Sequence, residues 1–129
     1  MMGENCSLEY RRRYLLEANE LAHAAVDIIE GKKASNILLL DMREVTLLAD
    51  YYILCDGSSG RQIKAISDEL LDELKNEGTR QATIEGTAES GWVLVDFGHV
   101  IVHIFSPEQR AYYQLEALWQ DAPIVMRMI

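Results

Sequence analysis

The turn Gly57-Ser58-Ser59-Gly60 is the first stretch whose residues could bind a ligand or take part in catalysis, because it lies between a strand-like run and a helical pattern. Free backbone N–H groups at the start of a helix can bind phosphate. The turn does not match the P-loop pattern, which requires a lysine directly after its last glycine. We therefore favour a tight turn before a helix that Ser59 caps, with Gln62 completing a capping box. A small nucleotide-binding or nucleotidyltransferase-like enzyme that uses this turn is the alternative.

Metal-assisted phosphoryl transfer would need carboxylates placed together on a strand. Asp68 and Glu69 follow the turn, but they lie in a run with helical spacing, and the sequence has no strand with alternating carboxylates. His99 and His103 are four residues apart and belong to no HExxH motif or Cys/His cluster. Cys55 lies in an apolar run, which is typical of a buried thiol. We predict no catalytic residue, no metal and no cofactor, and hence a protein that is not an enzyme.

A β-hairpin is predicted in the C-terminal third of the chain. The runs Trp92–Phe97 and Val100–Phe105 are rich in Val, Ile and aromatic residues and flank Gly98-His99. A Gly-X pair between such runs fits a two-residue type II′ turn. The pairing that this turn imposes produces one wholly apolar face, which we assign to the core: Val93, Val95, Phe97, Val100, Val102 and Ile104.

The opposite face of the hairpin carries Trp92, Asp96 and His103 among apolar neighbours, because side chains alternate along a strand. Trp is a frequent interface anchor, and a carboxylate can pair with Arg or Lys of a partner. This face is too apolar for free exposure and too polar for an ordinary core. Either a helix covers part of it or a partner protein docks on it.

The elements that position these residues are predicted from apolar spacing and from Gly, Ser and Pro at the boundaries. The predicted helices are Ser7 to about Glu30, Arg61–Glu77 and Pro107–Gln120, and the further strands are Ile37–Met42, Asp50–Asp56 and a possible short one at Thr83–Glu85. The last helix should turn Ala111, Leu115, Leu118 and Trp119 inward. The apolar tail Ile124–Ile129 should dock on the body or on a second subunit. We predict one α/β domain of α+β-like character spanning residues 1–129, with a mixed sheet of about five strands and helices packed on it.

The net charge of −9 disfavours direct nucleic-acid binding, because such a chain has few cations for phosphate contacts. It favours a basic protein partner, although the same charge also serves solubility. Cys6 and Cys55 form no CxxC pair, which fits a reduced, cytoplasmic location. No apolar run approaches the roughly 20 residues of a membrane-spanning helix, so no membrane partner is expected.

Three segments together resemble the Iojap family, the ribosomal silencing factors. They are ADYYILCDGSSGRQIKAISDEL (Ala49–Leu70), GWVLVDFGHVIVHIFSPEQRAYYQLEALW (Gly91–Trp119) and the closing Asp121-Ala122-Pro123. The resemblance covers roughly Leu15–Pro123. It implies a nucleotidyltransferase-like fold that lacks the catalytic carboxylates. It also implies a homodimer when free, and a translational repressor that binds the large ribosomal subunit through ribosomal protein number fourteen and sterically blocks joining of the small subunit when nutrients are scarce.

The resemblance also implies which residues bind the partner. From the hairpin motif these are Trp92, Asp96, Phe97, Gly98 and His103, and from the strand motif they are Asp50, Tyr51 and Asp56. The chain departs from the family at His99, where members often carry Asp. Its hairpin turn is therefore less acidic than is usual in the family.

Overall fold

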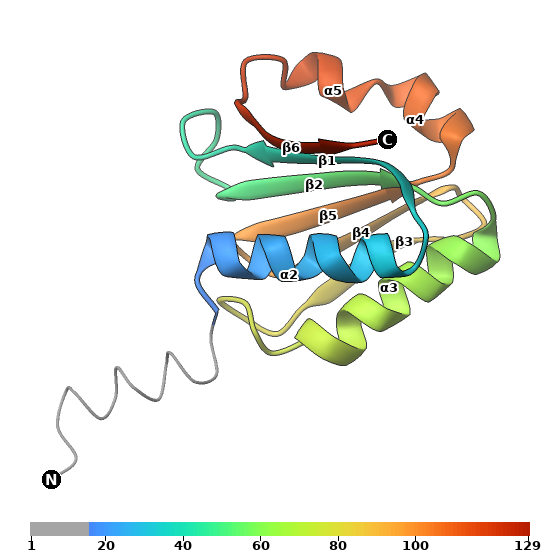
Figure 1. Ribbon diagram of the computed structural model, residues 1–129, viewed down its shortest axis with the longest axis horizontal. Helices are drawn as coiled ribbons and strands as arrows, with labels where there is room; N and C mark the ends of the chain where they lie inside the picture. Colours follow the sequence, from blue (N-terminus) through green and yellow to red (C-terminus); the bar gives the residue numbers. More distant parts are fainter. Residues whose placement is uncertain (1–15) are drawn as a thin grey trace, which may run out of the picture.

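A six-stranded mixed β-sheet lies between two layers of helices in the computed structural model, which describes residues 16–129 (Figure 1). The strands are β1 (Ser35–Asp41), β2 (Tyr51–Asp56), β3 (Thr83–Thr87), β4 (Trp92–Asp96), β5 (Val100–Phe105) and β6 (Ile124–Met128). The helices are α2 (Ala18–Gly31), α3 (Gly60–Leu74), α4 (Pro107–Tyr113) and α5 (Leu115–Leu118). The strand order is β3-β4-β5-β2-β1-β6. The α/β class and the mixed sheet are confirmed, with one strand more than the five that were expected.

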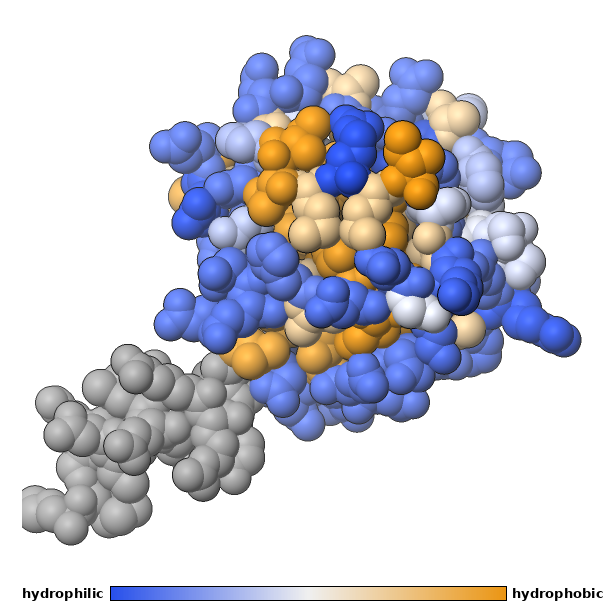
Figure 2. Space-filling model, in the orientation of Figure 1, coloured by the Kyte–Doolittle hydropathy of each residue, from blue (hydrophilic) through white to orange (hydrophobic). Residues whose placement is uncertain are grey.

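The extra strand is the apolar tail, which docks on the body of the protein. It pairs antiparallel with β1, from Ile37 opposite Met128 to Leu40 opposite Ile124, with an irregularity in the register next to Leu40. Figure 2 shows hydrophobic surface along this edge of the sheet. The strongly exposed apolar residues there are Ile124, Val125 and Ile129.

The central strands β1 and β2 are buried on both faces, as continuous apolar runs predict. Leu39 and Ile53 pack in one core, beneath α2 and α3. Leu38 and Leu54 pack in a second core on the other face, which also contains Leu115 of α5. Because both faces of these strands are covered, the exposed parts of the sheet lie towards its two edges, at β3 and β4 on one side and at β6 on the other.

The predicted hairpin and its register are confirmed. Gly98 has a φ of 98°, a left-handed conformation that suits glycine at the first central position of a type II′ turn. The Phe97 amide donates to the Val100 carbonyl at 2.9 Å, and Val95 lies opposite Val102. The face assigned to the core is buried.

The Ser59 cap predicted for α3 is confirmed, but the predicted capping box is not formed, and the helix ends at Leu74 rather than at Glu77. Ser59 caps the helix, and its Oγ accepts a hydrogen bond from the Gln62 amide at 3.1 Å. The Gln62 side chain reaches back to Ser58 rather than to the Ser59 amide, accepting from the Ser58 amide at 2.6 Å and from its hydroxyl at 2.9 Å. The turn is thus held by side chains of the helix that it precedes.

The predicted helix from Ser7 to Glu30 is confirmed from Ala18 onward and is wrong at Leu16 and Glu17. Ser7 lies outside the described residues, Leu16 and Glu17 are not helical, and α2 begins at Ala18. The Glu17 backbone is extended, and its amide donates to Glu20 Oε1 at 3.2 Å. This side-chain partner replaces the hydrogen bond that a longer helix would have supplied.

The predicted helix Pro107–Gln120 begins correctly, but it is wrong as one continuous helix, and its helical part ends at Leu118. Ser106 Oγ accepts from the Gln109 amide at 3.2 Å, and Pro107 is the first helical residue. The helix breaks at Gln114, whose φ of 48° separates α4 from α5. The break changes which side chains face the sheet. Leu115 is buried as expected and Trp119 is partly buried, but Ala111 is exposed and Leu118 is 71% exposed.

Candidate functional site

The candidate site is the sheet face opposite α2 and α3, which helices α4 and α5 cover only in part (Figure 1). His103 and Phe105 of β5 lie beneath these helices and are buried, His103 with 5% of its surface exposed. Trp92 of β4 and Ile101 of β5 are only partly buried. The covering helix that the sequence offered as one alternative is therefore present over one half of this face, and docking of a partner protein on the other half stays a prediction.

Aromatic side chains pack helices α4 and α5 against the sheet. The Trp92 ring centroid lies 4.7 Å from that of Tyr113, at the end of α4. Trp119, directly after α5, lies 4.6 Å from Tyr52 and 5.6 Å from His103. Trp92 thus joins the covered half of the face to the open half.

His103 is held as a neutral imidazole. Its Nδ1 accepts a hydrogen bond from the Trp92 indole Nε1 at 3.3 Å, which leaves the ring proton on Nε2. His103 Nε2 is buried and has no hydrogen-bond partner among the described residues. Burial lowers the pKa of His103 to about 4. A buried, neutral ring is suited to positioning Trp92 and unsuited to direct contact with a charged partner.

Asp96 carries a charge that the chain itself already compensates. Its Oδ2 lies 2.7 Å from the Arg80 guanidinium, and its Oδ1 accepts from the Gly98 amide at 2.8 Å. Glu85 lies on the same face, opposite Leu94, and makes no ion pair within the described residues. The uncompensated negative charge on this face therefore belongs to Glu85, which the sequence did not single out.

The other residues carried over from the family fall into two groups. Phe97 and Tyr51 are buried in the core beneath α2 and α3, and Asp56 is buried at the carboxyl end of β2. Asp50 and Gly98 are partly exposed, and the Asp50 amide donates to the His99 carbonyl beside the hairpin turn at 2.8 Å. Buried side chains cannot touch a partner in this conformation. Direct contact with a partner thus stays a prediction for the residues that are at least partly exposed: Trp92, Asp96, Gly98 and Asp50. For the buried residues, an indirect role in partner binding stays a prediction.

Sequence reasoning missed an ion-pair network centred on Arg110 of α4. Its Nη1 lies 2.9 Å from Asp56 Oδ1, and its Nε lies 3.0 Å from Glu116 Oε1. Burial opposes the charge on Arg110, but the hydrogen bonds to Glu116 and Asp56 outweigh it and raise its pKa. Asn36 Nδ2 donates to the second Asp56 oxygen at 3.0 Å. No motif signals this network, because its members come from three separate parts of the chain.

A second missed feature is the loop between β1 and β2. Leu47 and Leu48 are both strongly exposed. Asp41 closes the start of this loop by accepting from the Arg43 amide at 3.0 Å. Asp41 therefore has the turn-capping role that its position at the end of a strand suggests.

The nucleotide-binding alternative finds little support in the geometry. A Cβ at Gly57 would lie 2.6 Å from Ile63 Cγ1, so helix α3 packs directly on the turn. The Ser58 amide already donates to Gln62. Among residues 16–129 no group of three His, Cys, Asp or Glu side chains could hold a metal ion. Burial raises the pKa of the Cys55 thiol to about 12, which makes it a poor nucleophile.

No helix within the described part of the chain is long and apolar enough to cross a membrane.

Residues 15–128 match the model of a family described as ribosomal silencing factor during starvation. Among curated proteins, the ribosomal silencing factor of Bacillus subtilis is 45% identical over 81% of this chain and 86% of its own length. The ribosomal silencing factor of Halalkalibacterium halodurans is 42% identical over 82% of this chain and 91% of its own length. A crystal structure of a Chromobacterium violaceum protein superposes with a TM-score of 0.76 at 37% identity, covering 81% of this chain and 88% of that one.

Proposed function

Because this chain belongs to the family of ribosomal silencing factors, we propose that it represses translation by binding the large ribosomal subunit and excluding the small one. The contact on the large subunit is ribosomal protein number fourteen. A protein that occupies a surface where another must dock prevents association by occupancy alone. Such a mechanism needs affinity and concentration rather than turnover, so we propose that the protein is not an enzyme.

The observation that carries the proposal is the open half of the sheet face. Trp92, Leu94 and Ile101 lie there and are only partly buried. An aromatic anchor beside aliphatic side chains is typical of the centre of a protein interface. Glu85 supplies an uncompensated carboxylate on the same face, which suits a basic partner, and Asp96 supplies a second carboxylate that is paired with Arg80.

The proposal also concerns the setting in which the protein acts. With a net charge of −9, the chain is better suited to a basic protein than to RNA, so we expect no direct nucleic-acid binding. We further propose a cytoplasmic protein that is a homodimer when free. If the dimer used the same open face, dimerisation and ribosome binding would compete by mass action.

The experiment that tests the proposal is sucrose-gradient sedimentation of purified ribosomal subunits with and without the protein. We expect the protein to sediment with the large subunit and to reduce the amount of joined ribosomes. Trp92→Ala should lose both effects, whereas Lys64→Ala, an exposed change on α3 at the opposite face, should retain them. Wild-type protein that stays at the top of the gradient while the subunits join normally would overturn the proposal. In that case, nucleotide binding at Gly57–Gly60 would be tested next.

A further inference from the structure

Two neighbouring parallel strands of the sheet are followed by helices that lie on opposite faces of the sheet. Strands β2 and β5 are the one parallel pair in the described sheet. After β2 the chain enters α3 on one face, and after β5 it enters α4 on the other (Figure 1). In open α/β sheets, such diverging connections leave a crevice outside the carboxyl ends of the strands, and small molecules bind there.

A cavity of about 560 Å³ lies at this point. Asp56, the last residue of β2, and Pro107, the first of α4, both line it, and its far wall is formed by β6. The volume is within the range of small-molecule sites in proteins. The cavity is separate from the open sheet face, because α4 and α5 lie between the two.

The cavity has a preorganised cation at its base. The Arg110 side chain is nine-tenths buried and is fixed by Asp56 and Glu116. Its Nη1 also donates to the Asn36 carbonyl. Among the described residues its Nη2 group makes no hydrogen bond, so two N–H donors remain.

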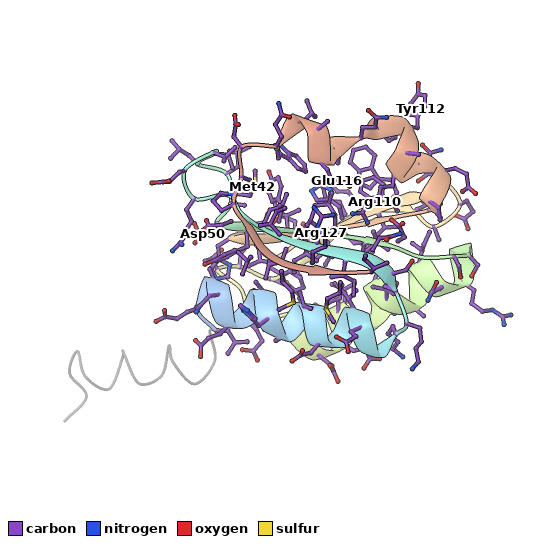
Figure 3. All side chains as sticks on the ribbon, turned by 45° about the horizontal axis from the view of Figure 1, so that its top comes forward. Met42, Asp50, Arg110, Tyr112, Glu116 and Arg127 are labelled. Carbon is purple, nitrogen blue, oxygen red and sulfur yellow. The ribbon has the colours of Figure 1, made fainter. Side chains whose placement is uncertain are left out.

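A second guanidinium lines the same cavity from the edge strand. Arg127 of β6 lies opposite Leu38 of β1 and makes neither an ion pair nor a side-chain hydrogen bond within residues 16–129. Figure 3 shows Arg127, Arg110 and Glu116 around the same space between the helices and β6. The remaining wall is largely aliphatic, with Met128 and Ala117. Asp56 and Glu116 also line the cavity, and both pair with Arg110, so Arg127 is the lining cation without an ion pair among the described residues. The site thus offers the free guanidinium of Arg127 and the Nη2 donors of Arg110 beside an apolar surface.

We propose that this cavity binds a small organic oxyanion, a carboxylate or a phosphate ester. Its charged group pairs with Arg127 and with the Nη2 group of Arg110, and its apolar part packs on Leu38 and Met128. Guanidinium groups bind both oxyanions through charge-assisted hydrogen bonds, so they do not choose between the two. This site is additional to the proposed partner-binding face, and its test needs no ribosome.

The test is titration of the full-length, isotope-labelled protein, followed through its backbone amide NMR signals. The probes are AMP, inorganic phosphate and hexanoate. We expect saturable shifts of amides that line the cavity, among them Asn36, Asp56 and Arg127. Saturation by AMP alone would identify a phosphate ligand, and saturation by hexanoate alone a carboxylate. If no probe saturates at millimolar concentration, or if the shifts centre on Ser58–Gln62, the proposal is wrong.

Two variants make the test specific. Arg127→Ala should weaken binding by about tenfold or more, as expected for a lost charge-assisted pair, whereas Arg61→Ala, an equal charge change on α3, should not. Ala117→Phe fills the cavity from the exposed side of α5 without removing a charge, and it should abolish binding. Unchanged affinity in Arg127→Ala, in a protein whose spectrum remains folded, would overturn the assignment.

Discussion

The Trp92 indole Nε1 donates a hydrogen bond of 3.3 Å to His103 Nδ1 on the neighbouring strand. The two residues share a sheet face, but they differ in exposure, because α4 and α5 cover His103 and leave Trp92 partly open. We infer that Trp92 contacts the partner and that His103 fixes the orientation of its ring. An anchor whose orientation is fixed before binding loses less conformational freedom in the complex.

Replacing Trp92 with alanine should weaken binding to the isolated ribosomal protein by about 2 kcal/mol or more, the range of interface hot spots. Calorimetric titration measures this affinity. Ile84→Ala is the control, because Ile84 is an exposed apolar residue that shares the opposite face with Val95. Equal affinities of wild type and Trp92→Ala would remove Trp92 from the site.

Acidification should destabilise the protein through His103. Burial lowers its folded-state pKa to about 4, below the ordinary value of about 6.5. Between these values the unfolded chain binds more protons, so stability falls as the pH drops from about 6.5 towards 4. The loss is about 1.4 kcal/mol per pH unit, or roughly 3 kcal/mol at pH 4.

Urea unfolding at pH 7 and pH 4.5 checks this prediction. His103→Phe lacks the titrating group and should lose less stability over the same interval, while the carboxylates shared by the two proteins contribute equally to both. A His103 ring whose NMR signals titrate with a midpoint near pH 6.5 would show that the imidazole is not buried as described.

Arg110→Ala should destabilise the protein by about 3–5 kcal/mol, the usual cost of removing one partner of a buried ion pair. Asp56 is only 4% exposed and would keep Asn36 as its remaining side-chain donor. Arg43→Ala is the comparison, because the Arg43–Asp41 pair is largely exposed and its loss should cost less than about 1 kcal/mol. Chemical unfolding that showed similar losses for both variants would contradict the structural role of the Arg110 network.

Charge reversal on the open face should slow association with a basic partner and weaken its dependence on salt. Glu85→Lys tests an uncompensated carboxylate, while Asp96→Lys also leaves Arg80 without its partner. Stopped-flow mixing over a series of salt concentrations measures both effects. Asp72→Lys makes the same charge change on α3, at the opposite face, and should change the rate less. If all three variants behave alike, only net charge matters.

Gln114→Gly should stabilise the protein by up to about 1 kcal/mol. Gln114 has a φ of 48°, a left-handed conformation that costs a residue with a side chain about 1–2 kcal/mol, and glycine relieves this cost while losing more entropy on folding. Ala111→Gly, within α4, should instead destabilise by roughly 0.5–1 kcal/mol. Thermal unfolding of the two variants should therefore move in opposite directions, and shifts of the same sign would contradict the prediction.

The sequence alone determined most of the local elements and the pairing of the hairpin strands β4 and β5. Alternating apolar residues on both sides of Gly98 defined the hairpin register, because a period of two leaves a single pairing that buries one whole face. Ser59 and Ser106 marked two helix starts correctly, since a side-chain cap acts within four residues of itself. The long motifs also identified the family, which the relatives then confirmed.

Only the tertiary structure decided which of these residues face solvent. The chain breaks at Gln114 between α4 and α5, and Leu118 of α5 is exposed. On the sheet face beneath these helices, His103 is buried and Trp92 is partly open. The Arg110 network joins α4 to Asn36 and Asp56, residues that are distant in the sequence and have no shared spacing. Burial and ion pairing depend on which elements come to lie on one another, and periodicity within a single element carries no information about that packing.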